Sequence, residues 1–207
     1  MEYWNDEIIQ ESWEKLILLR SKVKFTLIGG WAVHLYAKLL KSRDIDVVVD
    51  YEGLEKISML FGLIKNERLK KYEAKLGRVD VDIYVPYYSK LPIPPEDLLE
   101  KFRASLAGFR TVKPEALLAL KLGAFADRKD SVKGYKDAVD VLGLLFFSGL
   151  KAKDFNNVLE EYKLEELKNR LISLLNSSDQ RTLRYLNLNQ NSFSKLKRKY
   201  INELTEI

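Results

Sequence analysis

Hydrophobic and polar positions alternate with two different periods along the first half of the chain. Apolar residues at nearly helical spacing predict an amphipathic helix over residues 3–20, which includes Trp4. Short apolar or β-branched runs predict buried strands at 25–28 and 45–49. Strict alternation predicts a further strand over 78–85, with valines and Ile83 on one side and aspartates on the other.

Between and beyond these segments the pattern changes from mixed to purely helical. A helix is expected over 31–40 and another over 53–63, while 68–76 and 104–112 are each expected to form one strand. After residue 112 the period is helical only. The helices expected there span about 114–127, 135–147 and 154 to the end, with breaks near 176–178 and 187–191. This order predicts an α+β fold: a small mixed sheet flanked by helices over 1–112, followed by an all-helical region, 113–207, packed on it.

Composition limits the chemistry that such a fold could carry. The 207 residues include no cysteine and a single histidine, His34, which excludes disulfides and thiolate sites and disfavours a histidine-rich zinc site. Any bound metal must therefore be held by oxygen ligands, which favours Mg²⁺, Mn²⁺ or Ca²⁺. No apolar run is long enough to span a bilayer, and the acidic N-terminus is unlike a secretory signal, so no membrane partner and a cytoplasmic location are expected.

Charge is unevenly distributed over the chain. The formal net charge is +5, and residues 180–202 contain basic but no acidic side chains. Aromatic residues between these basic positions leave RNA binding open as one interpretation. Their helical spacing favours the other, in which the aromatics pack inward and the charges are solvated.

Two pairs of aspartates suggest a site. Asp44 and Asp46 lie two residues apart at the start of a predicted strand, and Asp80 and Asp82 repeat this spacing on another. Side chains at i and i+2 of a strand point to the same face, where like charges repel unless a cation lies between them. If the two strands are neighbours, their carboxylates converge into a site for a hard divalent cation.

A glycine pair supplies the second half of this site. Gly29 and Gly30 follow a predicted strand and precede a predicted helix, so backbone N–H groups at the helix N-terminus can approach a phosphate closely. A phosphate cradle together with a divalent cation site indicates chemistry on a nucleoside triphosphate. Each feature alone is more often a turn or a solvated strand end, and only their combination and order are specific.

The segments 27–36 (Leu-Ile-Gly-Gly-Trp-Ala-Val-His-Leu-Tyr) and 42–49 (Ser-Arg-Asp-Ile-Asp-Val-Val-Val) resemble the DNA polymerase β-type nucleotidyltransferase superfamily. Its signature is a strand, Gly-Gly or Gly-Ser, a helix, Asp-x-Asp and a later acidic strand. Within it the chain is most similar to the minimal branch that includes the AbiEii and MenT-type toxins. Segments 108–124 and 136–140 resemble later parts of those proteins, so the resemblance covers 23–148.

The resemblance implies roles for particular residues. Asp44, Asp46 and Asp82 would be the catalytic carboxylates and metal ligands, with Asp80 as the alternative third carboxylate. Gly29 and Gly30 would hold the triphosphate. Many members of the superfamily carry serine at the second of these positions, so Gly30 lacks a hydroxyl that would otherwise contact one phosphate.

Three further residues are candidates for nucleotide binding. Lys121 lies on the apolar face of the helix predicted after Pro114, where a lysine either binds an anion or extends its ammonium to solvent. In the toxins that the chain resembles, a lysine here approaches the nucleotide. Asp137 and Asp140 share one edge of the next helix, and they either join this site or form a solvated, salt-bridged edge.

Three functions remain open at this stage. The resemblance implies a nucleotidyltransferase that uses Mg²⁺ or Mn²⁺ to move a nucleoside monophosphate from an NTP to a hydroxyl of tRNA, another RNA or a protein. It also implies a toxin paired with an antitoxin. The alternatives are a catalytically weak nucleotide-binding regulatory or interaction module of the same fold, and a structural protein whose acidic strand ends are merely solvated.

Overall fold

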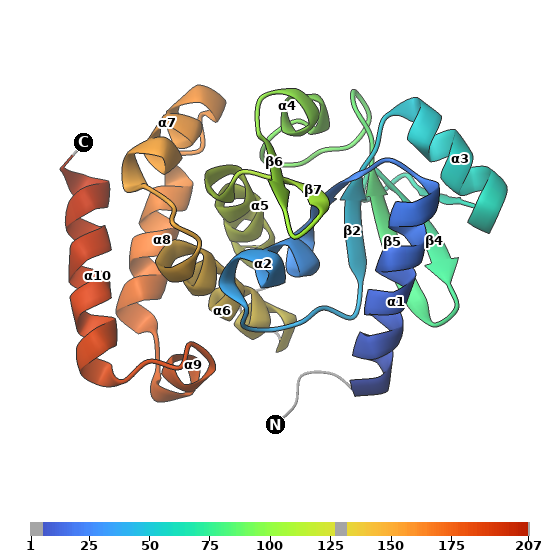
Figure 1. The fold of residues 1–207 in the computed structure, drawn as a ribbon. Helices are drawn as coiled ribbons and strands as arrows, with labels where there is room; N and C mark the ends of the chain where they lie inside the picture. Colours follow the sequence, from blue (N-terminus) through green and yellow to red (C-terminus); the bar gives the residue numbers. More distant parts are fainter. Residues whose placement is uncertain (1–5, 127–131, 207) are drawn as a thin grey trace. The chain divides into compact units, whose positions relative to one another are not determined.

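The computed structural model describes residues 6–126 and 132–206 (Figure 1). The first elements follow the predicted order closely. They are α1 (Asp6–Lys22), β1 (Thr26–Ile28), α2 (Gly29–Ala37), β2 (Ile45–Val48) and α3 (Tyr51–Phe61). The start of the first predicted helix, with Trp4, lies outside the described residues. Asp50 begins α3 as its N-cap, because its side chain accepts a hydrogen bond from the backbone N–H of Gly53.

The next elements agree with the prediction less completely. They are β3 (Ile64–Asn66), β4 (Lys71–Leu76), β5 (Val79–Tyr84), α4 (Pro95–Glu100), β6 (Arg103–Leu106) and β7 (Phe109–Val112). The prediction of one strand over 104–112 is wrong, because the chain reverses at Ala107 and Gly108, which have φ of 51° and 78°. Positive φ at both central positions is the geometry of a tight hairpin turn, so β6 and β7 pair as antiparallel neighbours.

In the described part of the chain, the strands form one seven-stranded mixed sheet in the order β3-β4-β5-β2-β1-β7-β6. The pairs β2–β5 and β1–β7 are parallel, and the other neighbouring pairs are antiparallel. The two acidic strands, β2 and β5, are therefore direct neighbours near the middle of the sheet.

The two sides of β5 differ in environment, as its alternating sequence predicts. Val79, Val81 and Ile83 are fully buried, whereas the intervening residues are partly exposed. Helix α1 packs against this strand. Trp31 at the start of α2 is buried and donates a hydrogen bond from Nε1 to Ser12 Oγ over 2.8 Å, so it is a core residue.

The remaining elements are helices only. They are α5 (Pro114–Ala126), α6 (Val132–Phe147), α7 (Ala152–Tyr162), α8 (Glu166–Ser177), α9 (Gln180–Tyr185) and α10 (Gln190–Thr205). The predicted breaks coincide with new helix starts, because Asp179 and Asn189 act as N-caps of α9 and α10. The end of the helix predicted to reach residue 127 lies outside the described residues.

The chain divides into two compact units. The first contains the residues up to Leu35 together with Lys41–Lys113, and the second contains Tyr36–Leu40 together with the residues from Pro114 onward. Within the second unit, α5 packs against α6, α7 and α8. The fold is thus α+β, a mixed sheet with helices followed by an all-helical C-terminal part. No helix in the described ranges is long and apolar enough to cross a membrane.

Candidate active site

The acidic strands place Asp46 and Asp82 side by side. Asp46 of β2 and Asp82 of β5 are partners in the parallel register, so their side chains leave the same face of the sheet. Both residues are partly buried. Two neighbouring carboxylates in such a position need a compensating cation, because their mutual repulsion is weakly screened there.

Gly29 lies directly against this pair. It begins α2 with φ of +65°, and a Cβ atom built at this position would come within 2.0 Å of Asp46 Oδ2. Only glycine therefore leaves room for the carboxylate at the start of the helix. The first turn of α2 has no acidic residue of its own. The partial positive charge of this helix end consequently favours the Asp46 carboxylate or another anion beside it.

The close approach of the two carboxylates affects the pKa of Asp82. Burial, followed by the negative charge of Asp46, raises the pKa of Asp82 to about 6, although Lys71 opposes this shift. Lys71 therefore only partly offsets the effects of burial and of the neighbouring Asp46 charge on Asp82. The pair is thus electrostatically suited to receive a cation.

The other two aspartates of the predicted set lie in different surroundings. Asp44 precedes β2, and its Oδ1 accepts a hydrogen bond from Arg43 Nε over 3.1 Å. Asp80 pairs with Lys75 over 3.1 Å and its side chain is half exposed. Of the two aspartates on β5, Asp82 is the one in register with Asp46, whereas Asp80 lies opposite Lys75 on β4.

Two residues that the sequence did not identify complete this face. Glu73 of β4 lies opposite Asp82, which gives a row of three carboxylates, Glu73, Asp82 and Asp46, across three neighbouring strands. Lys71 lies on the same strand two residues earlier. Its Nζ is 2.6 Å from Asp82 Oδ2 and 3.1 Å from Glu73 Oε1. Burial disfavours the charge of Lys71, but the hydrogen bonds that its ammonium donates to these carboxylates, together with their negative charges, raise its pKa overall.

The donor chemistry fits a hard cation, although the ligands are few. Among residues 6–126 and 132–206, no three histidine, aspartate or glutamate side chains are grouped so that they could hold a metal ion. Asp46 and Asp82 nevertheless offer two adjacent carboxylates in register. Mg²⁺ is commonly held by one or two carboxylates, with water and substrate phosphates as its other ligands. The pair is sufficient for such a site.

Lys121, Asp137 and Asp140 form a cluster within the second unit. Lys121 Nζ lies 3.3 Å from Asp137 Oδ1 and 2.8 Å from Asp140 Oδ2, and all three side chains are buried. The predicted anion for Lys121 is therefore supplied by the chain itself, across α5 and α6. The Oδ1 atom of Asp140 is buried without a hydrogen-bond partner in the described part of the chain. A role in nucleotide binding stays a prediction for these residues and for Gly30.

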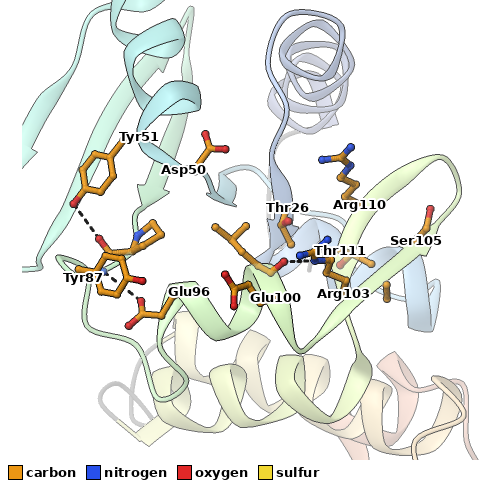
Figure 2. Close-up of a pocket in the computed structure, with 13 residues that line it drawn as sticks. Thr26, Asp50, Tyr51, Tyr87, Glu96, Glu100, Arg103, Ser105, Arg110 and Thr111 are labelled. Atoms are coloured by element: carbon orange, nitrogen blue, oxygen red, sulfur yellow. Dashed lines mark hydrogen bonds between the residues drawn. The ribbon is translucent and has the colours of Figure 1, made fainter.

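A cavity of about 820 Å³ in the first unit lies apart from the predicted residues, none of which lines it (Figure 2). Two exposed tyrosines occupy one side, where Tyr51 Oη donates to the Pro86 carbonyl and the Tyr87 N–H donates to Glu96 Oε2. Arg103 and Arg110 of the β6–β7 hairpin also line it. With three carboxylates beside two guanidinium groups, the lining is mixed in charge.

Comparison with known proteins gives similarity in structure only. No family model and no curated protein sequence matches the chain. Among solved structures, JHP933 from Helicobacter pylori aligns over 94% of each chain with a TM-score of 0.50 and 17% identity. An antigenic nucleotidyltransferase-like protein from Paracoccidioides brasiliensis aligns over 81% of this chain and 93% of its own, with a TM-score of 0.45 and 18% identity. At 17% identity, the likeness to JHP933 shows a shared fold and not an activity.

Proposed function

We propose that the protein is a metal-dependent nucleotidyltransferase that moves a nucleoside monophosphate from an NTP to an acceptor hydroxyl. The acceptor oxygen would bond to the α-phosphorus, and the bond to the pyrophosphate group would break. One observation carries this proposal: Asp46 and Asp82 lie in register on neighbouring strands, and Asp46 Oδ2 lies against Gly29 at the start of α2. The arrangement places an acidic pair, which can bind a cation, beside a helix N-terminus, which can bind the phosphates of a substrate.

In this proposal Asp46 and Asp82 hold Mg²⁺ or Mn²⁺, and Asp44 joins them by turning away from Arg43. A divalent ion there would polarise the phosphoryl oxygens and activate the acceptor hydroxyl. The chain itself would orient the triphosphate through backbone N–H groups at Gly29 and Gly30. Lys121, Asp137 and Asp140 are proposed to contribute to nucleotide binding from the second unit.

The acceptor and setting follow from the resemblance to the minimal toxin branch. We propose a hydroxyl of tRNA, another RNA or a protein as acceptor, and a toxin–antitoxin pair in the cytoplasm as the context. The net charge of +5 suits an RNA acceptor without requiring one.

The direct test is transfer of label from each of the four α-³²P-labelled NTPs, with Mg²⁺ or Mn²⁺, to total RNA and to protein extract. Label should appear in one acceptor class and be lost in Asp46→Asn and Asp82→Asn variants. The matched control is Asp80→Asn, which removes the same charge from β5 at a position paired with Lys75. Absence of labelled product with every NTP, or full activity of Asp46→Asn, would contradict the proposal.

A second function is favoured by the engagement of the carboxylates within the chain. Asp82 is bound by Lys71 and Asp44 by Arg43, and Gly30 has no hydroxyl for a phosphate. A nucleotide-binding regulatory or interaction module of the same fold would share these features. Calorimetry separates the two functions, because metal-dependent NTP binding without any turnover would assign the module.

A further inference from the structure

Lys71 is a lysine held inside the acidic row of the sheet. Only 11% of its side chain is exposed, and Nζ contacts both Asp82 and Glu73. Strands β4, β5 and β2 are adjacent, so the ammonium bridges the first two carboxylates of the row formed by Glu73, Asp82 and Asp46. In a two-metal site the ions lie about 3.5–4 Å apart, and a second ion here would need the carboxylate oxygens that Lys71 already binds.

We propose that the Lys71 ammonium replaces one of two metal ions, so that the protein itself binds a single divalent cation, on the Asp46 side of Asp82. This inference rests on the proposed function, since it concerns the same metal site. Lys71 is a positioning residue here: it holds Asp82 Oδ2 and leaves the other oxygen of that carboxylate for the metal ion.

The charges of the row agree with one metal ion. Glu73, Asp82 and Asp46 carry three negative charges when ionised, and one ammonium with one divalent ion neutralises them. Lys71 Nζ lies 2.6 Å from Asp82 Oδ2, so a second divalent ion bound to that oxygen would lie close to the ammonium. Repulsion between such close cations is weakly screened in a partly buried site and strongly opposes joint occupancy.

The geometry of β4 explains why Lys71 stays in place. Residues two apart on a strand share a face, so Lys71 and Glu73 both point toward the Asp82 side chain. Glu73 is held in turn by Asn66, whose Nδ2 donates to Oε1 over 3.0 Å. Lys75, two residues beyond Glu73, instead pairs with Asp80, and 72% of its side chain is exposed. It offers the same charge on the same strand outside the row.

The test counts bound Mn²⁺ by electron paramagnetic resonance on the full chain without nucleotide. Wild type, Lys71→Arg and the matched control Lys75→Met should each bind one ion. Lys71→Met should bind two, or bind its first ion about tenfold more tightly or better, because a positive charge beside the site is gone. Glu73→Gln should instead weaken Mn²⁺ binding, because it removes one negative charge from the row and leaves the positive charge of Lys71 in place.

Circular dichroism establishes that each variant is folded, and Glu73→Gln provides the test if Lys71→Met does not fold. Two ions bound by wild type would overturn the inference. So would Lys71→Met or Glu73→Gln binding Mn²⁺ with the wild-type number and affinity. Those results would leave the proposed function standing, whereas no Mn²⁺ bound by wild type or any variant would overturn both.

Discussion

At the scale of single residues, Gly29 has no room for a side chain. We expect Gly29→Ala to destabilise the fold, because a Cβ would lie 2.0 Å from Asp46 Oδ2 and the backbone has φ of +65°. The strained backbone alone costs about 1–2 kcal/mol for a residue other than glycine. Displacing the Asp46 carboxylate adds to this cost and removes the metal ligand from its place. Urea denaturation measures the stability, and Mn²⁺ titration measures the loss at the site.

Gly62 is the matched control for this change. It ends α3 with φ of +71°, and nothing lies within 4 Å of a Cβ built there. Gly62 has ψ of 160°, a region of backbone that is nearly restricted to glycine, so Gly62→Ala should cost only a backbone term of about 1–3 kcal/mol and leave Mn²⁺ binding unchanged. Equal losses of Mn²⁺ affinity for the two variants would mean that contact with Asp46 contributes nothing to the site.

Asp82 makes the stability of the protein depend on pH in a direction unusual for a carboxylate. Its pKa is raised from 3.8 to about 6 in the folded state. Between about pH 4 and 6 the folded chain therefore holds a proton that the unfolded chain has released, and the free energy of unfolding falls as pH rises through this window. Burial is the largest cause of the raised pKa, the negative charges of Asp46 and Glu73 add to it, and Lys71 opposes it.

Asp82→Asn should remove this contribution. Relative to Asp82→Asn, wild type should lose at most about 3 kcal/mol of stability between pH 4 and pH 7, since one pKa unit corresponds to about 1.4 kcal/mol. Chemical denaturation of both proteins across this range measures the difference. A difference that is constant with pH would show that the pKa of Asp82 is not raised.

At the scale of secondary structure elements, α5 and α6 are joined by a buried ionic cluster. We expect Lys121→Met to destabilise the second unit by about 3–5 kcal/mol, because it leaves the buried carboxylates of Asp137 and Asp140 without their ammonium. Thermal and urea denaturation measure this loss without reference to nucleotide binding.

The control for this prediction is another lysine of the helical region. Lys153 in α7 is exposed, so Lys153→Met should change stability by less than about 0.5 kcal/mol. If Lys121→Met were as stable as Lys153→Met, the cluster would be dispensable for folding, and a functional role for Lys121 would gain support.

The elements also show which parts of the fold can be predicted from sequence. Strands β2 and β5 are recognisable because one face of each is buried, so their side chains alternate or are continuously apolar. Strand β3 is only three residues long and largely exposed, and therefore gives no such pattern. The β6–β7 turn escapes detection because Ala107 adopts a positive φ that its sequence does not indicate.

Some residues of the candidate site can likewise be predicted from the sequence, and others cannot. Asp46, Asp82 and Gly29 could be predicted, because spacing along a strand and a glycine before a helix are local features. Lys71 and Glu73 could not, because their place in the site depends on the register of β4 against β5. Register is set by packing and turn geometry over the whole hairpin, and no short motif encodes it.

At the scale of the whole molecule, the net charge of +5 does not show that acidic and basic side chains gather in different places. The three carboxylates of the sheet row belong to the first unit, and the acid-free stretch 180–202 belongs to the second. Within that stretch the aromatic residues Phe193 and Tyr200 are buried on α10, as their spacing predicted. Lys195 and Arg198 are exposed on the same helix. An RNA acceptor would therefore meet solvated charges there rather than stacking aromatics.

This division gives a prediction that net charge alone does not. If single-stranded RNA contacts α10, Lys195→Gln with Arg198→Gln should lower the slope of log affinity against log salt by about 1.4, since each lost phosphate contact contributes about 0.7. Lys22→Gln with Lys24→Gln removes two exposed lysines from the first unit and should leave the slope nearly unchanged. Filter binding of one RNA oligonucleotide at several salt concentrations measures both. Both double variants remove two positive charges. Equal slopes would therefore show that RNA is attracted by the overall charge, whereas different slopes would show a contact at α10.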